Sequence, residues 1–506
     1  MTGYSMDRAR SGFERYDLLI VLALFAASRG LYALLGVEFD SSPYPGYFQF
    51  IDAPLLRTRL LESLWYFHAH PPLLNLFVGI GEKLFGDDAV VYFNVAFHAL
   101  GLLLAATVYL LTRRLSASRV TAVLTTALLV FSPSFVLYEN WLMYSFPAAA
   151  LVVMAALALH EYIGTRKAVW GAAFFGLLAT LLLTRSLFHL AWLVLIIGLV
   201  VVVLWERRWQ VLKVASVPLL VVVLWYGKNY YLFGAFTAST MMGLGMSNVS
   251  TLTVPREQLE PLVQTGELSP LALVDRFTKA PLFFSSQKLA PMGVPVVDEI
   301  SKSTGHYNWN NRQLIAINRI YARDALTAMR KFPRNYRAGV GLSNRLFFSP
   351  TSMNRFFTPE NRDAVVPIER LYDPILYGAR QMPEPAPQPV FGFVHSLALE
   401  VNTSSRLIIV WFLMLGYGYV HARRAIVDRK SGATPRAVVL GFFVVTAIYV
   451  HVVATTIELG ENYRYRFLVE PLFFVVTAVA ITDAVRWVRA KLEADKARAT
   501  QPASVI

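Results

Sequence analysis

A polar loop between residues 36 and 88 holds the side chains of this sequence that are best suited to acid–base chemistry. Asp52 follows an aromatic stretch and precedes Arg57 and Arg59. This spacing would place a carboxylate and two guanidinium groups on neighbouring turns of a helix. A carboxylate can accept a proton from a hydroxyl group, and arginine can bind a phosphate group. The alternative for Asp52 is that it caps a helix that begins at Pro54.

The same loop offers a second carboxylate and two histidines. Asp40 is the other candidate base, although the serines, prolines and glycine that directly follow it also suit a turn. His68 and His70 directly precede two prolines and could bind a phosphate or the hydroxyl groups of a substrate. A metal site is the less favoured interpretation of this pair, because the sequence defines no third and fourth ligand. A further alternative is that both rings bond backbone carbonyls at a membrane interface.

Charged residues also stand at the ends of apolar segments farther along the chain. Arg185, Lys228 and Arg464 could each contact a phosphate group. Glu139 is either a helix cap or a substrate contact. Glu461 belongs to a loop that also contains Glu458, Arg464, Arg466 and Glu470. Charges at membrane depth are costly, which favours a functional role. The alternatives are a lysine that snorkels to the interface and simple pairing between glutamate and arginine.

The composition is that of a membrane protein with several spans. Of the 506 residues, 56% are hydrophobic and 16% are charged, and the mean hydropathy is +0.47. A water-soluble chain could hardly cover this much apolar surface. The net charge of +14 lies largely in short loops, so it indicates membrane topology and not nucleic-acid binding. No cysteine occurs, which excludes disulfides and thiolate metal sites.

Ten apolar segments are predicted to span the membrane, because a spanning helix needs roughly 20 apolar residues. Their approximate bounds are 17–35, 89–112, 119–133, 142–160, 168–184, 187–204, 211–227, 405–422, 436–456 and 465–486. Arginine and lysine are concentrated in the connections on one side, which the positive-inside rule assigns to the cytoplasm together with both termini. The loop of residues 36–88 then faces the opposite side. The first segment is predicted to be retained, because no small-residue cleavage site follows it.

The predicted organisation has four parts. Residues 1–233 form an N-terminal transmembrane module that carries the outward loop 36–88. Residues 234–403 form a mainly helical extracytoplasmic domain that ends in a proline-rich tether, MPEPAPQP. Residues 404–490 supply the last transmembrane helices, and residues 491–506 a cytoplasmic tail.

Several short motifs resemble those of the GT-C membrane glycosyltransferases, in particular the protein O-mannosyltransferase and aminoarabinose-transferase-like branch (glycosyltransferase family 39-like). The matching positions are Asp52 followed by His70-Pro71-Pro72-Leu73, then Ser132-Pro133, Thr184-Arg185, the run from Lys228 to Phe236, and Glu461 with Arg464 and Tyr465. The resemblance covers most of the chain up to Phe236 and the final outward loop. The sequence departs from the family where many relatives carry an Asp-Glu pair, here Asp52-Ala53, and where Lys228 replaces an arginine.

The resemblance implies an all-α polytopic GT-C-like bundle of about ten transmembrane helices, in the plasma or inner membrane. It implies transfer of a hexose or pentose from a polyprenyl-phosphate donor to an extracytoplasmic glycan, lipid or protein, with inversion and without a cofactor or metal ion. Asp52 would be the base. The donor phosphate would contact Arg57, Arg59, Arg185, Lys228 and Arg464, and the substrates would be positioned by His68, His70, Glu139, Glu461 and Tyr465. The alternative function is a transporter or flippase of lipid-linked sugars, which would carry charges along a path through the bilayer.

Overall fold

The computed structural model describes residues 15–274, 289–378, 401–427 and 434–499. Within these ranges the chain forms helices and no strand. Two isolated bridges supply extended pairing there, Asp40 with Trp141 and Ser301 with Tyr307. The predicted all-α class is therefore confirmed. The proline-rich tether and the end of the predicted cytoplasmic tail lie outside the described residues.

Each of the ten predicted spans corresponds to an apolar helix. Seven spans are long and apolar enough to cross a membrane: α2 (Arg15–Leu34), α6 (Leu73–Phe85) continuing into α7 (Ala89–Ser116), α10 (Ser145–Thr165), α13 (Arg208–Phe233), α21 (Ser405–Val427), α22 (Pro435–Ile457) and α24 (Glu470–Ala499). An eighth is a pair bent by 60°, α8 (Arg119–Val130) and α9 (Pro133–Glu139), and two shorter apolar helices are α11 (Ala168–Thr184) and α12 (Leu190–Val203). The bend falls at Ser132 and Pro133, because a residue before proline is driven out of the helical conformation.

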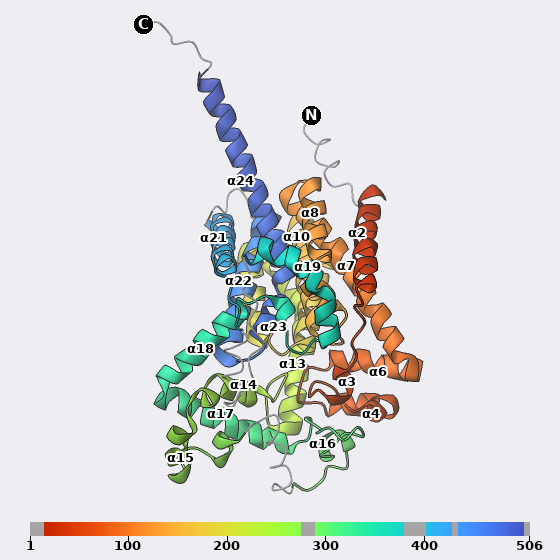
Figure 1. Ribbon diagram of the computed structural model, residues 1–506, viewed down its shortest axis with the longest axis vertical. Coiled ribbons are helices and arrows are strands. Elements are labelled where there is room, and N and C mark those ends of the chain that lie inside the picture. Colours follow the sequence, from red (N-terminus) through yellow and green to blue (C-terminus); the bar gives the residue numbers. More distant parts are fainter. Residues whose placement is uncertain (1–14, 275–288, 379–400, 428–433, 500–506) are drawn as a thin grey trace.

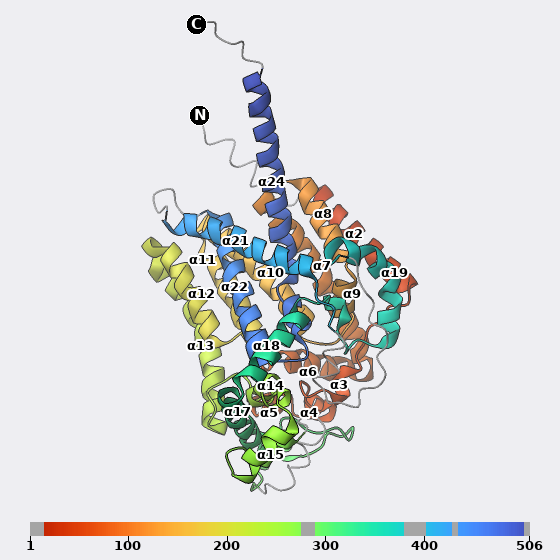
Figure 2. The same cartoon turned by 60° about the vertical axis from the view of Figure 1, so that its left-hand side comes forward.

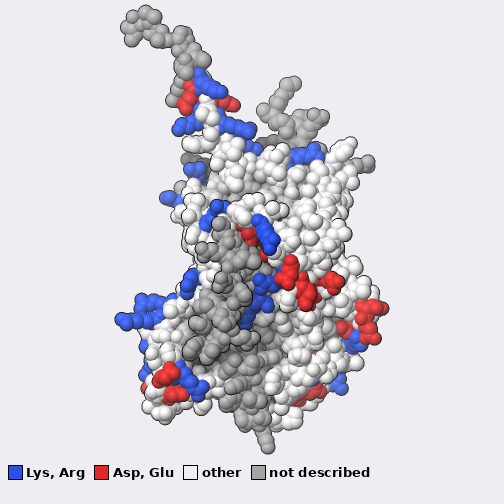
Figure 3. All heavy atoms as spheres, in the orientation of Figure 1, with Lys and Arg blue, Asp and Glu red and all other residues white. Residues whose placement is uncertain are grey.

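The apolar helices form one bundle with a polar assembly of short helices at one end. α2 begins and α24 ends at the other end of the bundle, beyond which α24 protrudes (Figure 1). α11, α12 and α13 lie on one side of the bundle, and α2 and α19 lie on the opposite side (Figure 2). The upper part of the face in Figure 3 shows few charged side chains, whereas both charge types gather around the polar end. This distribution is expected where helices contact lipid.

The loop of residues 36–88 folds into short helices at the polar end. These are α3 (Pro43–Gly46), α4 (Ala53–Thr58), α5 (Leu60–Trp65), α6 and η1 (Gly86–Asp88). α6 lies across the end of the bundle and packs against α4 and α7 (Figure 1). Gly79 permits close packing of α6 on α5, because a Cβ atom there would lie 2.3 Å from Leu60 Cδ1.

The described part of residues 234–378 forms the rest of the polar end. It contains α14 (Met242–Val249), η3 (Thr251–Thr253), α15 (Arg256–Gln264), η4 (Pro270–Leu273), α16 (Pro295–Asp298), α17 (Gln313–Lys331), α18 (Pro333–Phe347), η6 (Thr351–Met353) and α19 (Pro359–Leu376). α14 packs closely on α17, where a Cβ atom at Gly243 would lie 2.0 Å from the carbonyl oxygen of Asn318. α19 returns to the bundle and contacts α9. The predicted boundary between bundle and outer domain at residue 234 stays a prediction.

An aromatic cluster connects the segment after α18 to the bundle. Phe357 packs edge-on against Tyr138 and Trp141, with ring centroids 4.9 and 5.4 Å away. Tyr138 in turn stacks on Phe467 of the short helix α23 (Asn462–Phe467), at 3.8 Å. Buried aromatic side chains of this size dominate local packing energy. The cluster therefore fixes α9, α23 and the 350–357 segment relative to one another.

Candidate functional site

A large cavity opens where the bundle meets the polar end. Its volume is about 1590 Å³. Its wall combines the 46–49 loop, the connection between α11 and α12, α14, α15, the 355–356 segment and the turn after α22. Polar lining residues include Gln49, His70, Tyr144, Arg185, Asn248, Arg355, Glu458, Glu461 and Tyr465, and much of the remaining wall is apolar. This combination is typical of a binding site for an amphiphilic molecule.

Arg185 is the buried cation of this wall. It follows α11 and is 6% exposed. Its guanidinium group donates a hydrogen bond to the hydroxyl of Tyr144 and lies over the rings of Tyr144 and Tyr465, 4.2 and 4.8 Å from their centroids. Nε has no hydrogen-bond partner. Burial lowers the pKa of Arg185 to about 10, so the group stays charged at neutral pH. An unpaired guanidinium donor in a cavity wall is suited to binding an anion.

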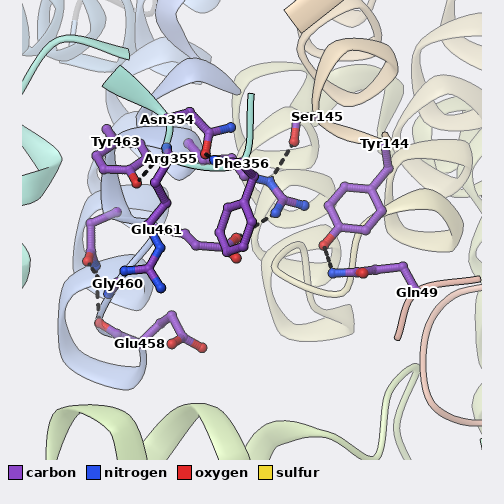
Figure 4. Close-up of polar contacts among 12 residues, drawn as sticks. Gln49, Tyr144, Ser145, Asn354, Arg355, Phe356, Glu458, Gly460, Glu461 and Tyr463 are labelled. Carbon is purple, nitrogen blue, oxygen red and sulfur yellow. Dashed lines mark hydrogen bonds and ion pairs between the residues drawn. The ribbon is translucent and has the colours of Figure 1, made fainter. Parts of the chain in front are cut away.

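A second arginine stands behind this wall. Arg464 is 1% exposed and donates from Nε to Ser145 Oγ at 2.8 Å and from Nη1 to Glu461 Oε2 at 2.5 Å. Its guanidinium lies 4.8 Å from the ring centroid of Tyr144, and Nη2 has no partner. Figure 4 shows Glu461 beside Arg355 and Phe356, on the side of the site opposite Gln49 and Tyr144. Glu461 is thus held by an ion pair while it lines the cavity.

Glu458 contributes a carboxylate to the cavity wall. Two hydrogen bonds hold this carboxylate, and neither comes from a cation. Oε1 accepts hydrogen bonds from Asn248 Nδ2 at 2.8 Å and from the backbone N–H of Leu459 at 3.1 Å. Burial raises the pKa of Glu458 to about 7, and the nearby charge of Glu461 also raises it. The group therefore changes protonation near neutral pH.

His70 lines the cavity with both ring nitrogens unbonded. The ring is 7% exposed and packs against Phe48 at 5.2 Å. Burial, followed by the charges of Arg185 and Arg464, lowers the pKa of His70 to about 3. The imidazole is therefore neutral at physiological pH and offers one donor and one acceptor.

Asp52, the predicted base, does not line the cavity. Asp52 Oδ2 accepts the backbone N–H of Ser303 and Oδ1 accepts the hydroxyl of Ser303, both at 2.7 Å. The residue occupies the N-cap position of α4, as the capping alternative predicts, but its side chain bonds Ser303 and makes no capping bond to the helix. The role of Asp52 as a base stays a prediction, and it would require the Ser303 contacts to be given up.

Asp40 makes the turn that its sequence context predicts. Oδ1 accepts the backbone N–H of Ser42 at 2.9 Å, whereas the buried Oδ2 has no partner. The backbone of Asp40 pairs on both sides of Trp141, with Asn140 and Leu142. Asp40 therefore attaches the first loop to the segment that carries Tyr144, but its carboxylate is not part of the cavity lining.

Three of the predicted phosphate contacts make structural contacts outside the cavity. Arg57 pairs with Glu82 and Asp87, and the exposed Arg59 pairs with Glu62. Lys228 donates to the carbonyl oxygens of Trp65 and Phe67, both at 2.9 Å. Lys228 is 7% exposed, so the snorkelling alternative is also wrong.

The predicted positioning residues divide in the same way. Tyr465, His70 and Glu461 line the cavity. His68 is fully buried behind it, where Nδ1 contacts Thr240 Oγ1 at 2.9 Å. Glu139 is also fully buried and pairs with Arg29 of α2, so it neither caps a helix nor reaches the cavity. His68 bonds a hydroxyl side chain, which differs from the expected bond to a backbone carbonyl.

The structure has a low similarity to several solved structures. ArnT from Cupriavidus metallidurans, bound to undecaprenyl phosphate, matches with 16% identity and a TM-score of 0.36, covering 92% of this chain and 78% of that one. The archaeal oligosaccharyltransferase AglB from Archaeoglobus fulgidus, in complex with an inhibitory peptide and a dolichol-phosphate, matches with 13% identity and a TM-score of 0.33, covering 94% and 52%. Both are GT-C enzymes, the class that the sequence motifs resemble. No protein-family model matches the chain, and no curated protein matches it significantly. At this similarity neither match places a residue.

Sequence reasoning gave no role to several residues of the cavity wall. Tyr144, Gln49 and Arg355 belong to it, and Gln49 Nε2 contacts the hydroxyl of Tyr144 at 3.4 Å (Figure 4). Phe356 packs edge-on against Tyr47 at 5.8 Å. The sequence TSMNRFF offers a signal for this segment, because Arg355 directly precedes two aromatic residues.

Proposed function

We propose that this protein is an integral membrane glycosyltransferase that transfers a sugar from a polyprenyl-phosphate donor to an acceptor at the polar end of the bundle. The observation that carries the proposal is the placement of Arg185. A buried guanidinium with a free N–H donor lines a largely apolar cavity at the end of membrane-spanning helices. A lipid monophosphate has an anionic head and an apolar tail, and this wall offers a binding surface for each of them.

The neighbouring membrane helices support entry of the donor from the bilayer. Leu187 and Ala191, near the start of α12, line the cavity together with Tyr449 and Val453 of α22. These side chains suit the first isoprene units of the lipid, while the phosphate lies against Arg185. The described basic residues of the arginine-rich connections do not line the cavity, which by the positive-inside rule supports an extracytoplasmic site in the plasma or inner membrane.

The chemistry is a direct displacement. An acceptor hydroxyl attacks the anomeric carbon, the new O–C1 bond forms as the bond from C1 to the phosphate oxygen breaks, and the lipid phosphate leaves with the electron pair. Inversion of the anomeric carbon follows from a single displacement. Arg185 stabilises the charge that develops on the leaving oxygen, with Arg464 adding positive potential from behind Tyr144. Neutral His70 and the Glu461 carboxylate line the same cavity, which supports a role for both in bonding sugar hydroxyls.

The test measures binding and transfer separately. Purified protein in nanodiscs is titrated with undecaprenyl phosphate and, as a control, with undecaprenol, and thermal stabilisation is recorded. Transfer is then measured with a panel of radiolabelled polyprenyl-phosphate sugars and hydroxyl acceptors. Arg185→Gln is expected to abolish the phosphate-dependent stabilisation and to lower kcat/KM about 10²–10³-fold. Arg57→Gln is the matched control and is expected to stay within about twofold, because Arg57 lies outside the cavity.

Two results would overturn the proposal. One is equal stabilisation by undecaprenol and undecaprenyl phosphate, which would mean that no phosphate is recognised. The other is movement of labelled donor across the bilayer with no release of lipid phosphate for any acceptor, which would establish a transporter of lipid-linked sugars.

A further inference from the structure

We infer that Glu458 is the residue that accepts the proton from the acceptor hydroxyl. This inference rests on the proposed transfer reaction and adds the base that the cavity supplies. Glu458 belongs to the last outward loop and has no predicted role, whereas the family resemblance implies that Asp52 is the base.

Glu458 lies where the helix bundle meets the polar end, and the two substrates must come together there. It directly follows α22 of the bundle, and its side chain reaches α14 of the polar end through Asn248. The backbone of the same turn is fixed by α18, where Ser343 Oγ donates to the carbonyl oxygen of Glu458 at 2.9 Å. A donor phosphate against Arg185 and an acceptor entering along α14 would therefore meet beside this carboxylate.

One oxygen of Glu458 is fixed by hydrogen bonds, and the other lies against a glycine of α14. Asn248 and the N–H of Leu459 both bond Oε1. A Cβ atom at Gly245 of α14 would lie 2.7 Å from Oε2. Figure 4 shows the carboxylate extending away from its own turn. Gly245 therefore lets the carboxylate pack closely against α14. Glu458 lines the cavity and is partly exposed, so a hydroxyl group can approach it from the cavity.

The surroundings leave Glu458 available as a base near neutral pH. Its titratable neighbours are Arg185 from the α11–α12 connection and Glu461 from its own loop, with Tyr465 of α23 also coupled to it. α14 and α18 present the uncharged Asn248 and Ser343. The pKa of Glu458, raised to about 7 by burial, matches what a general base needs.

Of the other candidate carboxylates, Glu461 and Asp52 are each held by another group. Asp40 does not line the cavity, and Glu257, which does, is an exposed residue of α15. Glu461 Oε2 is ion-paired with Arg464, and both oxygens of Asp52 accept bonds from Ser303. In the transfer step the proton of the acceptor hydroxyl passes to Glu458 Oε2 as the O–C1 bond forms. The electron pair of the broken C1–O bond leaves on the lipid phosphate, so charge and atoms balance.

Four variants test the assignment by pH–rate profiles of kcat/KM. The wild type is expected to lose activity about tenfold per pH unit below pH 7, because Glu458 is then protonated. Glu458→Gln is expected to lower kcat/KM about 10²–10⁴-fold. It is also expected to remove the loss of activity below pH 7, which is the acid limb of the profile. Asn248→Ala is expected to move the limb to higher pH, because it removes a hydrogen bond that favours the ionised form.

Two glycine variants distinguish the effect of a displaced Glu458 carboxylate from the effect of a damaged fold. Gly245→Ala is expected to lower kcat about tenfold or more, with donor affinity unchanged, by pushing Oε2 aside. Gly341→Ala on α18 is the matched control, since a Cβ atom there meets nothing within 4 Å. Thermal unfolding of all four variants checks that they are folded.

The outcomes distinguish the inference from the proposed function. If wild type transfers sugar and Glu458→Gln retains its rate and its acid limb, Glu458 is not the base and the proposed function stands. If Asp52→Asn removes the limb while Glu458→Gln keeps it, Asp52 is the base. If wild type neither binds undecaprenyl phosphate nor transfers sugar from any donor, the proposed function fails and this inference falls with it.

Discussion

Arg29 of α2 and Glu139 at the end of α9 form an ion pair inside the bundle, with 12% and 0% of their side chains exposed. The guanidinium of Arg29 also lies over Phe25 and Phe135, 4.1 and 5.1 Å from the ring centroids. It donates to the carbonyl oxygen of Val130 at 3.0 Å, directly before the α8–α9 bend. The ion pair therefore holds the α8–α9 bend against α2. The segment that follows the bend carries Tyr144, which lines the cavity.

Removal of Arg29 is expected to destabilise the fold strongly. Arg29→Met leaves the Glu139 carboxylate buried without a cation, which costs about 3–5 kcal/mol of unfolding free energy. The double variant Arg29→Met/Glu139→Gln is expected to recover most of this loss, because the unpaired charge is gone. Thermal and denaturant unfolding in detergent measure both. A double variant no more stable than Arg29→Met would show that the ion pair is not the cause.

Gly101 of α7 is expected to be intolerant of any side chain. A Cβ atom there would lie 1.7 Å from Glu139 Oε1, in a buried pair that cannot move aside freely. Gly101→Ala is expected to cost about 1–3 kcal/mol by overpacking. Gly176→Ala on α11 is the matched control, because a Cβ atom there meets nothing within 4 Å. Equal melting temperatures for the two variants would contradict the packing described.

The membrane helices could be predicted from the sequence because lipid imposes one simple requirement. A spanning segment must be apolar over its length, so hydropathy located the ten apolar helices. The bounds differed where other forces act. The third predicted span, 119–133, ends in the structure at Val130, and α24 continues to Ala499, past the predicted end at 486. α17 is amphipathic, with Leu314 and Ile317 buried, although Leu326 is 45% exposed.

Asp52 is expected to behave as a structural partner of Ser303. Asp52→Asn and Ser303→Ala remove the same contacts, so their effects on unfolding free energy are expected to be non-additive by about 0.5–3 kcal/mol in a double-mutant cycle. Both single variants are expected to reduce transfer by similar, modest factors. Loss of transfer in Asp52→Asn at full stability, with Ser303→Ala active, would instead identify Asp52 as the base.

The site could be predicted only in part, because side chains far apart in sequence build it. Arg185 stood out as a cation that membrane topology did not explain, and the structure places it in the cavity wall. Lys228 looked equivalent in sequence, yet its ammonium group is occupied by the carbonyls of Trp65 and Phe67. Nothing near Asp52 in sequence indicates Ser303, and nothing near Glu458 indicates Gly245. Such pairings follow from tertiary packing and not from local pattern.

Acid is expected to destabilise the fold through His70. The pKa of His70 is lowered to about 3 in the folded state by burial and by Arg185 and Arg464, against an ordinary value of 6.5. The folded state therefore binds fewer protons than the unfolded state between these values. Stability is full above pH 6.5 and falls as pH drops below it, by about 2 kcal/mol at pH 5 for one histidine. His70→Asn is expected to flatten the dependence of unfolding free energy on pH by that amount; a curve parallel to wild type would refute this.

Lys228 is expected to stabilise the segment of residues 65–70, which carries His68 and His70, and not to bind the donor phosphate. Lys228→Met leaves the carbonyls of Trp65 and Phe67 without their donor, which costs about 1–3 kcal/mol. Hydrogen exchange is expected to rise in residues 60–70, since the ammonium group holds that segment against Trp225 of α13, whose ring centroid is 3.8 Å away. Binding of undecaprenyl phosphate to the folded fraction is expected to change less than in Arg185→Gln. If the variant is as stable as wild type but no longer binds the phosphate, Lys228 contacts the donor directly, because a residue that only supports the loop cannot lose phosphate binding while the loop stays intact.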